Sequence, residues 1–183
     1  KKEYLMKLSK FIVKNSGFWW EDDLKSGKIK ISTDSSYETN NSGQFIWNSG
    51  TWEDGTWKGG TWKNGTWGKG KWEKGKWKKG TWRDGIWKGG TWQGGTWKNG
   101  EWQGGLWLNG TWEDGEWFDG TWRDGTWKNG YWGNGYWENG TWKDGTWENG
   151  YWENGAWERG KWNYGTWKDG TWKGGTGRYG TIW

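Results

Sequence analysis

One five-residue unit, T-W-x-x-G, limits what this chain can fold into more than any other feature. Trp occupies every fifth position from Trp47 to Trp172, and Gly occupies every fifth position from Gly50 to Gly180. The unit that ends at Gly180 lacks the Trp, and a partial unit follows it. A fixed short period of this kind is the signature of a repeat architecture, in which each repeat contacts mainly its neighbours.

Composition decides what can fill the interior of such a repeat. The 183 residues include 29 Trp and 38 Gly but no Pro, Cys or His. Leu, Ile and Val are too scarce in the repeats to build a core, so the interior must consist of Trp with small residues fitted around it. Disordered segments are poor in aromatic residues, and we therefore expect this chain to be ordered.

Each position of the unit has its own chemistry. Position 1 is most often Thr, position 2 is Trp, and position 3 is mostly Lys, Glu, Arg or Gln, which face solvent. Position 4 is mostly Asp, Asn or Gly and position 5 is Gly, a pair that favours tight turns because these residues tolerate left-handed dihedrals. The pattern predicts short extended segments separated by turns. Helix is excluded, because Gly at every fifth residue costs roughly 1 kcal/mol each relative to Ala.

Two all-β arrangements satisfy this pattern. In a β-solenoid every turn bends the same way, Trp and Gly point inward, and the Thr and charged positions point outward. In an antiparallel meander of three-residue strands, alternate turns reverse the chain and all Trp lie on one face. The solenoid is favoured, because open sheets rarely exceed about ten strands and the exposed Trp face of a meander needs a partner. The solenoid predicts that indoles along the whole rod form its core, for example Trp52, Trp72, Trp92, Trp112, Trp132 and Trp152.

The five-residue period resembles that of the pentapeptide-repeat proteins, over Ile46 to Gly180. That family has a large apolar central residue and a small residue two before it, as this chain has Trp and Gly. The resemblance implies a right-handed, four-sided β-helix with four units per coil, hence about seven coils and a rod of roughly 32 Å. The string G-x-W-x-[DN]-G, as in Gly95 to Gly100, is also similar to the first half of a MORN repeat. The Trp/Gly runs of this chain also look like runs found in phage structural proteins and bacterial surface proteins.

Residues 1–45 are not repetitive and form a separate segment before the repeats of 46–183. Tyr4, Leu5, Leu8, Phe11 and Ile12 share one face of an expected amphipathic helix. Residues 28–32 alternate polar and apolar residues as a half-buried strand does, and residues 33–43 are expected to be a polar connection. We interpret the segment as a cap for the open end of the rod, with attachment to a protein partner as the alternative.

Few residues offer themselves for chemistry or binding. Without His or Cys the chain lacks the usual general base, thiolate and imidazole ligand, so we expect neither an enzyme nor a cofactor or metal site. Lys and Arg predominate between Lys58 and Lys88, and Asp and Glu between Glu101 and Arg159. The candidate contact residues are the outward tyrosines and a lysine-rich stretch, namely Tyr131, Tyr136, Tyr151, Lys69, Lys71, Lys74, Lys76, Lys78 and Lys79.

The sequence therefore favours a non-enzymatic structural or spacer module of a virion or cell surface. A module that binds glycans or single-stranded nucleic acid is the alternative from another class, with nucleic acid the less favoured ligand of the two. A subunit that self-associates into filaments through its uneven charge is a third hypothesis. No apolar run approaches the ~20 residues of a membrane-spanning helix, so no membrane span is expected.

Overall fold

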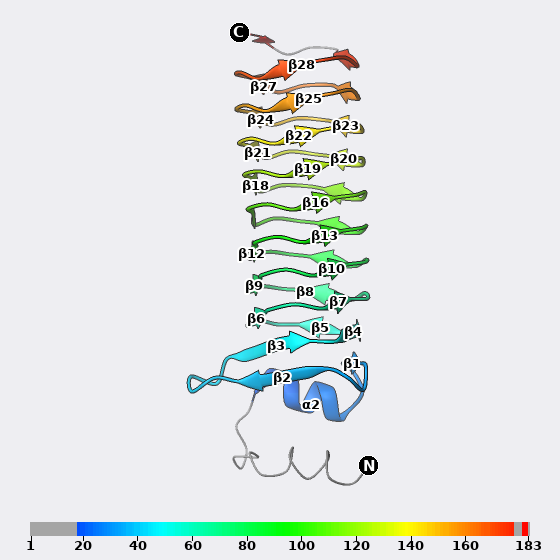
Figure 1. Cartoon of the computed structure of the whole chain (residues 1–183), viewed down its shortest axis with the longest axis vertical. Helices are drawn as coiled ribbons and strands as arrows, with labels where there is room; N and C mark the ends of the chain where they lie inside the picture. Colours follow the sequence, from blue (N-terminus) through cyan, green and yellow to red (C-terminus); the bar gives the residue numbers. More distant parts are fainter. Residues whose placement is uncertain (1–17, 178–180, 183) are drawn as a thin grey trace.

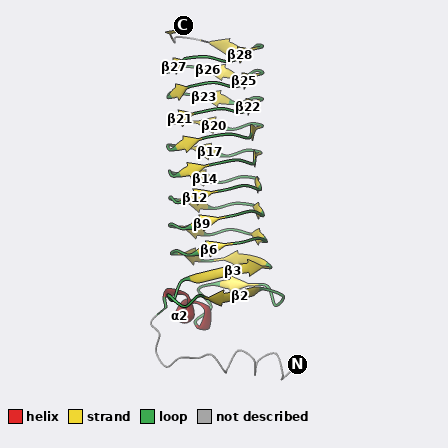
Figure 2. Ribbon diagram, turned by 60° about the vertical axis from the view of Figure 1, so that its left-hand side comes forward, coloured by secondary structure: helices red, strands yellow, loops and turns green. Residues whose placement is uncertain are grey.

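The computed structural model describes residues 18–177 and the backbone of 181–182. These residues form a straight rod in which short strands stack above one another along the long axis, with one helix below the first coil (Figure 1). The chain turns between every pair of strands, so three sheets run along the rod. The view turned by 60° shows strands on the sides and loops at the edges (Figure 2). We refer to the sheets as faces A, B and C.

The strands of the three faces follow one another in the order A, C, B along the repeats. Face A contains β1 (Lys30–Ile31), β4 (Thr51–Asp54), β7 (Thr66–Trp67), β10 (Thr81–Trp82), β13 (Thr96–Trp97), β16 (Thr111–Trp112), β19 (Thr126–Trp127), β22 (Thr141–Trp142), β25 (Ala156–Trp157) and β28 (Thr171–Trp172). Face C contains β5 (Thr56–Trp57), β8 (Lys71–Trp72), β11 (Ile86–Trp87), β14 (Glu101–Trp102), β17 (Glu116–Trp117), β20 (Tyr131–Trp132), β23 (Thr146–Trp147), β26 (Lys161–Trp162) and β29 (Thr176–Gly177). Face B contains β2 (Ser36–Thr39), β3 (Phe45–Ser49), β6 (Thr61–Trp62), β9 (Lys76–Trp77), β12 (Thr91–Trp92), β15 (Leu106–Trp107), β18 (Thr121–Trp122), β21 (Tyr136–Trp137), β24 (Tyr151–Trp152), β27 (Thr166–Trp167) and β30 (Thr181–Ile182).

The expected β-solenoid is confirmed, and the antiparallel meander is wrong for the repeats. From β3 onward each strand pairs in parallel with the strand three units later, as Thr96 and Trp97 pair with Thr111 and Trp112. The ladder consists of regular backbone bonds; the Thr111 amide donates to the Gly95 carbonyl at 2.9 Å. Parallel pairing follows because every turn bends in the same sense, so each coil brings the chain back in its original direction.

The coil has three sides, not the four that the resemblance to pentapeptide-repeat proteins implies. Partners on one face are 15 residues apart, so three units complete each coil, and the nine strands of face C correspond to about nine coils. At ~4.8 Å between strands, the rod is roughly 43 Å long instead of 32 Å. The reason lies in the indole: three Trp side chains, each meeting the next edge to face, fill the cross-section.

The core is a bundle of Trp stacks, as expected. Every repeat indole from Trp47 to Trp157 is at most 1% exposed. Within a coil, successive rings meet edge to face; the centroids of Trp107 and Trp112 are 6.0 Å apart at 70°. Between coils, rings stack nearly parallel, so each indole is enclosed on its faces and edges. The expected core residues are among the buried set, namely Trp52, Trp72, Trp92, Trp112, Trp132 and Trp152.

A few indole N–H groups donate to position-4 carbonyls of the next coil. Trp77, Trp147, Trp152 and Trp157 donate to carbonyls 17 residues later at 3.0–3.2 Å. Most other buried indoles have no partner within hydrogen-bonding geometry. The stacks thus hold together chiefly through apolar burial and ring contact, and less through the polar edge of the ring.

The corners explain why position 5 is Gly. Gly105 has φ +117°, and a Cβ there would lie 2.6 Å from the Gly90 carbonyl oxygen one coil below. This refines the prediction that Gly points inward. The missing side chain at position 5 chiefly allows the backbones of successive coils to approach each other. A carboxylate at position 4 completes the turn; Asp114 Oδ1 accepts from the Gly115 amide at 2.8 Å.

A non-repetitive cap closes the N-terminal end, as the cap interpretation predicts. Helix α2 (Trp19–Lys25) lies across the first coil, and the strands β1 and β2 pair in antiparallel fashion with β4 and β3. The strand expected at 28–32 is confirmed in part, as the two-residue strand β1 (Lys30–Ile31). The expectation of a connection at 33–43 is wrong in part, because Ser36–Thr39 forms β2. The expected helix at residues 4–12 lies outside the described residues.

Candidate contact surfaces

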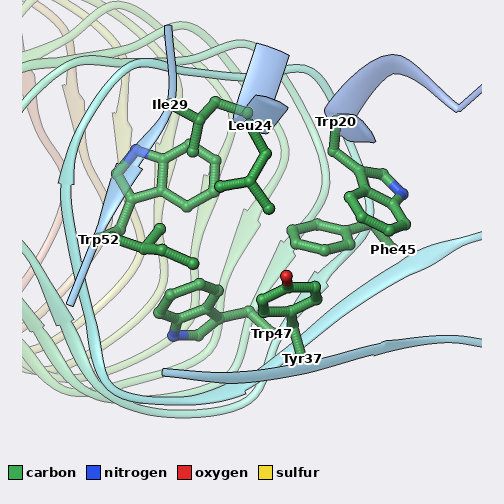
Figure 3. A pocket seen from close by; sticks show the side chains of 8 residues that line it. Trp20, Leu24, Ile29, Tyr37, Phe45, Trp47 and Trp52 are labelled. Carbon is green, nitrogen blue, oxygen red and sulfur yellow. The ribbon is translucent and has the colours of Figure 1, made fainter. Parts of the chain in front are cut away.

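The interior of the cap offers no ligand site. Aromatic residues of the cap close two of the three Trp stacks from below: Tyr37 stacks on Trp47 at 6.2 Å, and Phe45 contacts Trp57 at 5.0 Å. Figure 3 shows Tyr37, Phe45 and Trp47 around a small cavity that Trp20, Leu24 and Ile29 also line. The cavity has a volume of only about 10 Å³, no more than one water molecule needs. The cap is therefore a packed plug.

The cap is tied to the first coil by a charged pair at its edge. Lys58 Nζ donates to Asp23 Oδ2 at 2.8 Å, and Lys28 lies 3.7 Å from Oδ1 of the same carboxylate. The hydrogen bond from Lys58 lowers the pKa of the Asp23 carboxyl below its ordinary 3.8. Because Asp23 is 15% exposed and Lys58 43% exposed, the pair is only partly shielded from water.

The predicted lysines do not form one binding strip. They surround the coil of residues 66–80: Lys71 lies on face C, Lys76 and Lys78 on face B, and Lys69, Lys74 and Lys79 at the three corners. Lys69 lies 3.6 Å from Asp54, and Lys71 lies 3.9 Å from Glu73. A polyanion running along one face meets only some of these charges, so the geometry weakens the nucleic-acid alternative.

Lys71 also approaches Lys88, which lies on the same face in the next coil. Lys71 occupies position 1 of its unit and Lys88 position 3. The hydrogen-bond contact with Lys71, and the repulsion between the two ammonium groups, lower the pKa of Lys88. Glu73 partly offsets this effect. Like charges thus gather locally on face C even though the lysines as a set are dispersed.

The predicted tyrosines are brought together in part. Tyr136 and Tyr151, adjacent on face B, stack at 5.3 Å with planes 4° apart. The Tyr136 hydroxyl donates to Glu153, and this bond raises the pKa of Tyr136 to about 12. Tyr131 lies on face C, 37% exposed, and its ring approaches the Cα side of Gly133. All three point outward, as expected.

Two exposed aromatic residues were missed by reasoning over the five-residue unit. Phe118 at position 3 is 42% exposed, and Tyr164 at position 4 is 54% exposed. With a 15-residue coil, Phe118 lies directly below Gly133, and Tyr164 directly above Asn149. Only the 15-residue length of the coil shows that they lie near the tyrosines in space, because neither residue is close to a tyrosine in the sequence.

Surface ion pairs link successive coils. Glu113 pairs with Lys128 at 3.2 Å, and Asp144 pairs with Arg159 at 2.9 Å; in both pairs the residues are 15 apart. Exposed pairs of this kind contribute about 0–1 kcal/mol each, so they tune register more than they stabilise the rod. Among the described residues, no group of three or more acidic side chains converges as a metal site would require.

Within residues 18–177 and 181–182, no helix is long and apolar enough to cross a membrane. Comparison with protein-family models, curated proteins and solved structures found no match.

Proposed function

We propose that the chain is a non-enzymatic structural module, a rigid spacer that holds two points of a virion or cell-surface assembly at a fixed separation. The continuous Trp stacks carry this proposal. Each indole contacts the rings before and after it on both its faces and its edges, so no coil can bend away without separating aromatic contacts. Regular solenoids of this kind behave as quasi-one-dimensional rods.

The surface fits the same role. Positions 3 and 4 present charged and amide side chains that pair between coils, and the described part of the chain has only short connections between its helix and strands. The N-terminal segment is the natural point of attachment to a protein partner. The likeness to pentapeptide-repeat and MORN units rests on the T-W-x-x-G unit and supports a scaffold role by analogy only.

A distance measurement tests the rigid spacer. Asn64 and Asn154 are both exposed and occupy equivalent corner positions six coils apart, and the chain has no Cys that interferes with labelling. Spin labels on Asn64→Cys and Asn154→Cys should give one narrow distance distribution near 29 Å, from ~4.8 Å per coil. Deleting residues 96–110, one whole coil, should shorten it by about 4.8 Å. A broad distribution, or one that the deletion leaves unchanged, contradicts the proposal.

A further inference from the structure

The outward aromatic side chains of the repeats gather at one edge of the rod. Phe118 and Tyr131 lie on face C, Tyr164 lies at the corner between faces C and B, and Tyr136 and Tyr151 begin strands on face B. We refer to these residues as the aromatic corner. They come from a stretch of 47 residues, yet the 15-residue coil places them within about four coils of each other. Among the described repeats, face A carries no outward aromatic residue.

A shallow, largely open groove runs along this edge, parallel to the rod axis. Its floor consists of corner glycines such as Gly135 and Gly150, which have no side chains to fill it. Asp119, Asn134 and Asn149 form one wall and Thr121, Tyr136 and Tyr151 the other, and the open volume is about 550 Å³. Elsewhere on face B the second wall is Thr, Lys, Ile or Leu, so only here do aromatic rings form it.

The two kinds of aromatic residue in the corner differ in what they expose. Tyr136 and Tyr151 stack on each other, so much of their ring faces is already occupied and mainly their edges line the groove. The Tyr131 ring instead lies over Gly133, where every other unit except that of Gly68 carries a longer side chain, next to the exposed Phe118. Tyr164 is more exposed than either. Tyr131, Phe118 and Tyr164 therefore supply free apolar ring surface beside a polar groove.

The charged residues around the groove indicate which class of ligand this surface can bind. Asp119 lines the groove, whereas Glu153, which is not part of the lining, accepts a hydrogen bond from the Tyr136 hydroxyl. The bonds from Lys168 and Tyr136 lower the pKa of the Glu153 carboxyl, and the Lys168 ammonium offsets its negative charge, so Asp119 is the acidic group that faces a ligand in the groove. Carboxylates repel phosphate and sulfate, whereas carboxylate, amide and hydroxyl oxygens accept hydrogen bonds from sugar hydroxyls. The lysine-rich coil lies several coils away.

We propose that the aromatic corner binds a neutral, extended polysaccharide. The chain lies in the groove along the rod axis, with its hydroxyls bonded to Asp119, Asn134 and Asn149. The apolar faces of its rings pack on Tyr131, Phe118 and Tyr164, which removes apolar surface from water. Asp119, Asn134 and Asn149 follow one another in three successive coils, so polar groups recur at a regular spacing along the groove.

The test is affinity electrophoresis of the full chain through gels that contain one polysaccharide each. The panel contains the neutral polymers β-glucan, xylan, mannan and soluble chitin oligomers, and the polyanions heparin and polygalacturonate. We expect retardation by at least one neutral polymer, and about tenfold weaker binding for Tyr131→Ala combined with Tyr164→Ala. Thr126→Ala, on face A, is the matched control and should bind as the unmodified chain does.

Four outcomes overturn the proposal. The first is that no neutral polymer retards the chain, and the second is that the tyrosine variant is retarded as strongly as the unmodified chain. The third is that the chain binds the polyanions more strongly than the neutral polymers and that added salt abolishes this binding. The fourth is that the tyrosine variant loses self-association while sugars have no effect on either protein. The last outcome, seen by sedimentation at several concentrations, assigns the corner to a second copy of the chain. Because both tyrosines are exposed, an unchanged melting temperature of the variant shows that it still folds. The label-distance experiment on the spacer does not depend on this result.

Discussion

Trp97 lies face to face on Trp112, with ring centroids 4.8 Å apart and planes 7° from parallel. This separation is close to the spacing of neighbouring strands, ~4.8 Å, because both rings project inward from paired strands β13 and β16. It also falls within the range in which aromatic pairs attract. The backbone ladder and the ring stack therefore share one repeat distance, and each strand added to a face adds a ring to its stack at little strain.

Removing one ring from the middle of a stack should be costly. Trp112 is fully buried between Trp97 and Trp127. We expect Trp112→Ala to lower the free energy of unfolding by about 3–5 kcal/mol, because it loses the transfer energy of the indole and leaves a cavity. Trp172→Ala is the control, since Trp172 is 40% exposed at the end of its stack. Thermal or denaturant unfolding of both variants checks this; equal losses for the two contradict an interior held by the stacks.

The two glycines of one corner should differ sharply. Gly105 has φ +117° and faces the Gly90 carbonyl, whereas a Cβ on its neighbour Gly104 meets nothing nearer than 3.7 Å. Gly105→Ala should destabilise the rod by more than about 1 kcal/mol, because it combines an unfavourable dihedral with a clash. Gly104→Ala should change stability little. Chemical denaturation of the pair measures the difference, and similar midpoints argue against close coil contact at position 5.

The five-residue unit predicts much of this fold, but it does not predict the number of sides of the coil. Position 2 had to be interior because Trp47 to Trp157 supply nearly all the apolar surface, and position 5 had to form the turn. The number of units per coil, three, becomes apparent only when units 15 residues apart in the sequence are compared. On face A position 1 is Thr in every unit except Ala156, whereas the Lys, Tyr, Ile, Leu and Glu exceptions fall on faces B and C.

The aromatic corner was hidden for the same reason. Tyr131 and Tyr136 are sequence neighbours by one unit but occupy different faces, whereas Phe118 and Gly133, 15 residues apart, are in direct register. Only the coil length reveals that Tyr131 can lie over Gly133 beside Phe118. The lysines show the converse, because residues 69–79 are contiguous in sequence and yet encircle the rod.

Acid should weaken the attachment of the cap to the first coil. The bond from Lys58 holds the pKa of Asp23 below its ordinary 3.8. A lowered pKa in the folded state means that the stabilisation is present above about pH 3.8 and is lost as the pH falls through the folded value.

Asp23→Asn should therefore cost up to about 1 kcal/mol at pH 7, a value discounted for the partial exposure of the pair. The difference from the unmodified chain should disappear at low pH. Unfolding curves at a series of pH values test this, with the exposed Asp22→Asn as control. A difference that persists in strong acid means that Asp23 acts by packing, not through its charge.

Engineered disulfides should distinguish three sides from four. Thr96 and Thr111 are paired neighbours on face A, so their Cα atoms should lie ~4.8 Å apart, within the range of disulfides. Thr96→Cys with Thr111→Cys should therefore oxidise readily in a chain that has no other Cys. Thr96→Cys with Glu116→Cys, a pair 20 residues apart, should not, because Glu116 lies on face C. Mass spectrometry after mild oxidation reads the result, and the opposite pattern of crosslinks requires a four-sided coil.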